Sequence, residues 1–86
     1  MIVLSAINDI SEVSKLHEAW QEYLASPLIV IDANAVEKLD TAILQLLTVL
    51  IGEADKNNTE VKWEGVSDEM KHAVKLLGLN GPLKIH

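Results

Sequence analysis

The chain has 86 residues, of which 49% are hydrophobic, so it can form one small domain with its own core. Its net charge is −6, from 13 acidic and 7 basic residues, which excludes a direct nucleic-acid ligand because phosphates need a basic surface. It has no cysteine, which excludes disulfides and thiolate metal sites and fits a reducing compartment.

No membrane segment is expected from the sequence. No apolar run reaches the length of about 18 residues that a membrane span needs, and the first residues lack the basic start and long apolar stretch of a signal peptide. No repeat, linker or low-complexity tract interrupts the chain. We therefore expect a single cytoplasmic domain over residues 1–86 that does not insert into a membrane.

The N-terminal part of the chain predicts a strand and then a helix. Residues 2–7 (IVLSAI) are apolar with small residues, as in a strand, and Asn8-Asp9 follows as a turn. The Ser26-Pro27 pair ends the helix, because the residue before a proline is pushed out of the α region. Apolar residues recur at helical spacing before that pair: Val13, Leu16, Trp20, Tyr23 and Leu24.

The central part of the chain predicts a second strand and a second helix. Residues 28–31 (LIVI) are all apolar and mostly β-branched, which predicts a strand buried on both faces. Asp32 ends that run. Asp40 is placed to cap a following helix, because its carboxylate can accept hydrogen bonds from free N–H groups of the first turn. That first turn presents Thr41.

The helix that begins at Thr41 has two predicted faces. Its core face, at steps of about 100° per residue, consists of Ile43, Leu46, Leu47, Leu50 and Ala54. Its outer face consists of Thr41, Gln45, Thr48 and Gly52. Leu44 and Ile51 are predicted on the flank, where they would give the solvent side an apolar border suited to docking. A wide core stripe is the alternative interpretation of the same pattern.

The C-terminal part predicts a third strand and a third helix. Residues 59–64 alternate between apolar and polar, as in a half-buried strand, and Gly65 breaks the pattern. Ser67 is placed to cap a helix, and Gly78 to end it in a left-handed conformation. Residues 83–85 predict a short edge strand. Strands alternating with helices indicate an α/β sandwich with parallel neighbouring strands.

The sequence shows no catalytic grouping. The histidines His17, His72 and His86 lie in different predicted elements, without a partner at motif spacing for a triad or a metal site. The four glycines are scattered, so no phosphate-binding loop is present. We therefore expect neither an enzyme nor a bound cofactor or metal.

Three carboxylates could gather near the carboxyl end of the central strand, where α/β folds bind ligands: Asp32, Glu37 and Asp40. Such a group could hold a divalent cation or perform acid–base chemistry. The favoured interpretation is that Asp40 caps the helix, Asp32 braces the loop and Glu37 is solvated, because hard cations usually need more oxygen ligands.

Two regions of the chain resemble STAS domains, the family of anti-sigma factor antagonists and of the cytoplasmic domains of sulfate transporters. The first comprises Asp32, a spacer with the apolar Val36, and residues 39–42 (LDTA) with the leucine-rich helix. The second, residues 61–67 (VKWEGVS) followed by residues 76–79 (LLGL), is similar to the closing strand and last helix of the family. The resemblance implies a mixed sheet of about four strands with about three or four helices mainly on one face.

The resemblance also implies how such a domain works. In STAS antagonists of anti-sigma factors, a kinase phosphorylates the serine or threonine after the motif aspartate, and Thr41 matches that position. The adjacent helix is the binding face, which corresponds here to Asp32, Asp40, Thr41, Leu44, Gln45, Thr48 and Ile51. Family members usually carry glycine two residues after the phosphorylated residue, where this chain has Ile43.

The resemblance leaves two classes of partner open. The first is an anti-sigma-type or chemotaxis kinase, with the chain as an antagonist or adaptor in a bacterial signalling circuit. The second is the ATPase of a lipid-transport ABC transporter, in which single-domain STAS proteins are accessory subunits. Leu44 and Ile51, if exposed, could alternatively form a symmetric homodimer.

Overall fold

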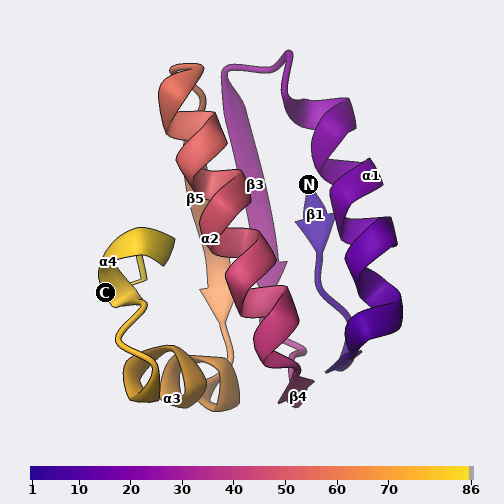
Figure 1. Cartoon of the computed structure of the whole chain (residues 1–86), viewed down its shortest axis with the longest axis vertical. Coiled ribbons are helices and arrows are strands. Elements are labelled where there is room, and N and C mark those ends of the chain that lie inside the picture. Colours follow the sequence, from indigo (N-terminus) through magenta and orange to yellow (C-terminus); the bar gives the residue numbers. More distant parts are fainter. Residues whose placement is uncertain (86) are drawn as a thin grey trace.

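A computed structural model describes residues 1–85, so the expectation about His86 lies outside the described residues. Figure 1 shows two helices packed in front of a small sheet, with the two C-terminal helices at one side and one end. The elements are β1 Ile2–Val3, β2 Ile7–Asn8, a 3-10 turn at Ile10–Glu12, α1 Val13–Tyr23, β3 Leu28–Ala33, β4 Lys38–Leu39, α2 Thr41–Lys56, β5 Glu60–Val66, α3 Asp68–Leu76 and α4 Asn80–Leu83.

The strands form two parallel sheets, which confirms the predicted α/β class. One sheet has the order β1-β3-β5, and the other pairs β2 with β4. Every strand pairing of the described residues is parallel, so the mixed sheet that the resemblance implied is not found here. The single strand predicted for residues 2–7 is divided, because β1 pairs with β3 whereas β2 pairs with β4.

The helices α1 and α2 cover one face of the larger sheet (Figure 1). Burial therefore alternates along β3: Ile29, Ile31 and Ala33 are buried against the helices, whereas Leu28 is exposed and Val30 is half-buried on the open face. The prediction of a strand buried on both faces was wrong, because apolar residues were read without knowing that only one face is covered.

The helix α2 buries a wider stripe than the sequence indicated. Leu44 and Ile51, predicted on the exposed flank, are 1% and 0% exposed, whereas Leu46, predicted in the core, is only half-buried. The reason is that α2 contacts α1 and α4 as well as β5. Leu44 and Ile51 are thus core residues and cannot border a docking surface or form a homodimer contact in this structure.

The C-terminal residues form a helix and not the predicted edge strand. The helix α4 contacts α2, and its last residue Leu83 is buried, as is Ile85 two residues further on. The indole Nε1 of Trp63 on β5 donates to the carbonyl oxygen of Leu83 at 2.8 Å. This segment therefore closes the core at the side of β5. Among residues 1–85, no helix has the length and hydrophobicity needed to cross a membrane.

Candidate docking surface

The helix α2 begins as the sequence predicts. Asp40 is extended, and its Oδ1 accepts a hydrogen bond from the main-chain N–H of Ala42 at 2.8 Å. This bond satisfies one of the N–H groups that a first turn leaves free. Thr41, the first helical residue, is exposed to solvent. Another macromolecule can therefore reach the side chain of Thr41 without any change in the fold.

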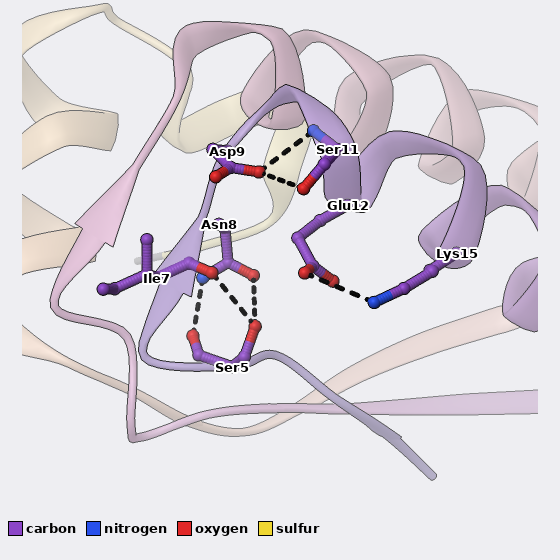
Figure 2. A network of polar contacts seen from close by, with 7 residues as sticks. All are labelled: Ser5, Ile7, Asn8, Asp9, Ser11, Glu12 and Lys15. Carbon is purple, nitrogen blue, oxygen red and sulfur yellow. Dashed lines mark hydrogen bonds and ion pairs between the residues drawn. The ribbon is translucent and has the colours of Figure 1, made fainter.

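The start of α2 is held by the chain's own N-terminal segment. The main-chain N–H of Asp40 donates to the carbonyl oxygen of Asn8 at 2.8 Å, and that of Lys38 donates to Ala6 at 2.9 Å. The buried Asn8 side chain donates through Nδ2 to the carbonyl oxygens of Ser5 at 2.6 Å and Lys38 at 3.5 Å. Figure 2 shows the Asn8 side chain turned toward Ser5. The pairing of β2 with β4 thus fixes the position of the Asp40 cap.

Asp32 braces the loop after β3. Its Oδ1 accepts from the main-chain N–H of Asn34 at 2.9 Å and from the Asn34 Nδ2 at 3.0 Å. The Asn34 amide lies over Gly65, where a Cβ atom would approach it to within 2.6 Å or less. Asp32 is half-buried, and both of these hydrogen bonds are with Asn34 of the same loop. A side chain at position 65 would therefore displace the Asn34 amide from this space.

The outer side of α2 is uncharged from Thr41 to Gly52, before the exposed Glu53 and Lys56, and we call this uncharged part the α2 face. It consists of Thr41, Gln45, Thr48, Val49 and Gly52. Gln45 is exposed as predicted, whereas Thr48 is half-buried and donates its hydroxyl to the carbonyl oxygen of Leu44 at 2.9 Å. Val49 is 60% exposed and was missed by the sequence analysis, although it lies one turn after Gln45. Open space surrounds the position of a Cβ atom at Gly52.

The structure brings no predicted metal ligands together. Among residues 1–85, no group of three or more histidine or carboxylate side chains is arranged to hold a metal ion, and this includes Asp32, Glu37 and Asp40. His17 and His72 are exposed on different helices.

A cleft of about 360 Å³ lies between β1 and α1, with Leu4, Leu16 and Ile43 among its apolar lining residues. Glu12 and Lys15 also line it and form an ion pair across 3.7 Å (Figure 2). Nucleophilic catalysis requires a nucleophile with an adjacent base. Ser5 is among the lining residues, and its hydroxyl donates to the carbonyl oxygen of Ile7 at 3.2 Å and not to a side-chain base.

The fold and this surface define a class of protein: a small α/β domain with helices over one sheet face and an exposed Asp-Thr helix start. A sequence-family model described as "Mlab, STAS domain" matches residues 1–85. The chain therefore belongs to the STAS family, whose domains generally mediate protein–protein interactions and are generally not enzymes. No curated protein matches the sequence.

Proposed function

We propose that this chain is a non-enzymatic adaptor or anti-sigma factor antagonist of a bacterial signalling circuit. A partner kinase, of the anti-sigma or chemotaxis type, binds the N-terminus of α2 and the α2 face. Asp40 and Thr41 lie at one end of this surface, Gln45 lies next along it, and the exposed part of Thr48 lies at its side. Asp32 contributes by holding the loop that leads to Asp40.

The observation that carries this proposal is the chemistry of the α2 face. Its five residues are uncharged, although 23% of the chain is charged, and the centres of protein interfaces are depleted in charge. Val49 is exposed beside Gly52, a glycine that no neighbouring atom of the fold requires. Glycine inside a helix costs about 1 kcal/mol relative to alanine. A partner that approaches the helix backbone closely accounts for both residues.

Phosphorylation of Thr41 would act as a switch on this surface. It adds about −1.5 to −2 charges at neutral pH, and a helix N-terminus favours such charge by about 0.3–1 kcal/mol, so the fold should persist. A partner would have to desolvate this charge next to the Asp40 carboxylate, which opposes docking. Each loss of about 1.4 kcal/mol weakens binding tenfold.

The same surface supports a second candidate function, that of an accessory subunit of a lipid-transport ABC transporter. Single-domain STAS proteins serve in such systems, and the family match covers residues 1–85 as one STAS domain. In this case the ABC ATPase binds the α2 face. Affinity capture followed by mass spectrometry distinguishes the candidates, since one expects a kinase and the other an ABC ATPase.

Substitution of Thr41 tests docking with the purified partner from that capture. We expect Thr41→Glu to keep the parent circular dichroism spectrum and to weaken binding by about tenfold or more in calorimetry, because each 1.4 kcal/mol lost is a factor of ten. Thr41→Ser is the matched control, since it keeps the hydroxyl and should bind like the parent. If Thr41→Glu also binds like the parent, Thr41 lies outside the interface.

A further inference from the structure

The strand β1 forms a free edge of the larger sheet. It pairs with β3 alone, with Val3 opposite Asp32, and the main-chain N–H of Leu4 donates to the carbonyl oxygen of Asp32 at 2.9 Å. In a parallel ladder of this register, Ile2 and Leu4 make the bonds to β3, so the main-chain N–H and C=O of Val3 face the opposite way. Within residues 1–85, neither of these two groups has a hydrogen-bond partner.

The free groups of Val3 lie at the cleft of about 360 Å³ between β1 and α1. Side chains alternate along a strand: those of Ile2 and Leu4 are buried, whereas that of Val3 is 64% exposed and points to the opposite face of the sheet. Val3 nevertheless lines the cleft, so it reaches the cleft through its main chain. Its N–H and C=O are therefore polar groups of the cleft wall.

Most polar side chains of the cleft wall are already engaged within the chain. Four of them form the contacts drawn in Figure 2: Ser5, Asn8, Glu12 and Lys15. The Tyr23 hydroxyl accepts from the amino group of Met1 at 2.8 Å and donates to the Met1 carbonyl oxygen at 3.4 Å. The charges of the lining residues cancel, because Glu12 pairs with Lys15 and the Met1 amino group offsets Glu22.

We infer that this cleft binds a small, uncharged organic molecule with an apolar body and a carboxamide head group. The apolar body would contact Leu4, Leu16 and Ile43 in a volume of about a dozen water molecules at about 30 Å³ each, which lies in the lower part of the range for ligand sites. A carboxamide offers a carbonyl acceptor and an N–H donor side by side, which matches the free N–H and C=O of Val3. This inference goes beyond the proposed function and does not depend on it.

The chemistry of the cleft argues against other occupants. A carboxylate lacks the donor that the Val3 carbonyl requires, and an ammonium lacks the acceptor that the Val3 N–H requires. Either ion would also leave water for a wall without net charge, which costs free energy. An added β-strand needs a row of free main-chain groups, whereas β1 has two residues and the Tyr23 hydroxyl already contacts the Met1 carbonyl oxygen.

The test uses the full chain, labelled with ¹⁵N, and three probes that share a linear carbon chain: hexanamide, hexanoate and hexylamine. We expect hexanamide to bind in the millimolar range, as small ligands of few atoms do, with chemical-shift changes centred on residues 1–5, 15–23 and 43. Hexanoate and hexylamine should each bind at least about fivefold more weakly, because each leaves one Val3 group without a partner and brings a charge out of water.

Two matched pairs of variants locate the binding, and circular dichroism checks that each variant is folded. Ala19→Leu adds a larger side chain to the α1 wall of the cleft and should weaken hexanamide binding by about fivefold or more. Ala25→Leu makes the same change at an exposed position outside the lining residues and should leave binding unchanged.

The second pair concerns the main chain of Val3. Val3→Pro removes the free N–H, which the ladder with β3 does not use, so the preference for hexanamide over hexylamine should fall by about threefold or more. Val3→Ala keeps the N–H and should retain the preference. The Ala19 pair decides the outcome if Val3→Pro does not fold.

Several results would overturn the inference. They are no binding of hexanamide, equal binding of the three probes, an equal loss in Ala19→Leu and Ala25→Leu, and shifts centred outside the cleft. If an extended peptide of valine and threonine binds at β1 while hexanamide does not, the sheet edge takes a partner strand and the inference fails. The test does not involve Thr41, so a failure here leaves the docking proposal standing.

Discussion

At the scale of single residues, Gly52 is a position at which folding and partner binding are expected to favour different residues. A side chain at this position would meet no atom within 4 Å, so Gly52→Ala should raise the free energy of unfolding by about 0.5–1 kcal/mol through helix propensity. The same substitution should weaken partner binding if the partner approaches the α2 face closely. Urea unfolding and calorimetry measure the two effects.

A second substitution on the α2 face, Gln45→Ala, is the control for Gly52→Ala. Gln45→Ala also replaces an exposed residue of α2 and adds no atoms to the surface, so it distinguishes a steric effect from a general loss of contacts. Unchanged binding by Gly52→Ala would contradict a close approach of a partner to α2.

Asp9 gives a residue-scale expectation about pH. The Ser11 hydroxyl and main-chain N–H both donate to the Asp9 carboxylate and hold its pKa below the ordinary value of 3.8. A carboxyl group whose pKa is lowered by folding stabilises the folded state above its unfolded pKa, and this contribution is lost as the pH falls through the folded pKa. Acidification below pH 3.8 should therefore remove this contribution to the stability of the folded state.

Comparison with Ser11→Ala checks this expectation, because that variant lacks the hydroxyl donor. The parent should be the more stable protein near neutral pH, and the difference in free energy of unfolding should shrink in urea titrations performed at successively lower pH below 3.8. A difference that grows on acidification would contradict the assignment.

At the scale of the element, α2 shows how periodicity can identify a helix and still misplace its buried edge. The Asp40 cap and the exposure of Thr41 and Gln45 agree with the sequence analysis. The predicted exposure of Leu44 and Ile51 does not agree, because α1 and α4, which are distant from α2 in the sequence, pack against it. An apolar residue at the edge of a stripe looks the same in the sequence whether or not another helix covers it.

Two substitutions on α2 test its corrected orientation. Leu44→Ala should lower the free energy of unfolding by about 2–5 kcal/mol, because it leaves a cavity in the core. Val49→Ala should change it by about 0.5 kcal/mol or less, because Val49 is largely exposed and surface substitutions have small effects. Urea unfolding measures both. Equal losses in the two variants would mean that α2 is rotated relative to this structure.

At the scale of the whole molecule, the C-terminal segment completes a small core. Truncation after residue 79 removes the buried Leu83 and Ile85, each of which contributes about 1.5–3 kcal/mol by burial. Such a loss is a large part of the stability of a small domain. We expect the truncated chain to unfold at a much lower urea concentration than the parent.

Trp63→Phe is the matched control for this truncation, because it removes the indole N–H that donates to Leu83 while keeping an aromatic side chain. It should cost about 0.5–1.5 kcal/mol for the lost hydrogen bond, plus a smaller packing loss. An unchanged urea midpoint in the truncated chain would show that α4 does not contribute to the core.

The sequence by itself determined the features that depend on neighbouring residues. It identified the α/β alternation, the Asp40 and Ser67 caps, the left-handed Gly78 and the exposure of Thr41. Caps, turns and periodicity involve only a few neighbouring residues, so they can be recognised from a short stretch of the sequence. The resemblance to STAS domains rests on the same kind of local signal, and the family match confirms it.

Only the tertiary structure decided which surfaces remain free. It buried Leu44 and Ile51, exposed Leu28 and Val49, and folded residues 80–83 as a helix that packs against α2. It also placed α3 at the same end of the molecule as the start of α2 (Figure 1). These outcomes depend on contacts between segments that are distant in sequence, and burial at each position is set by what packs over it.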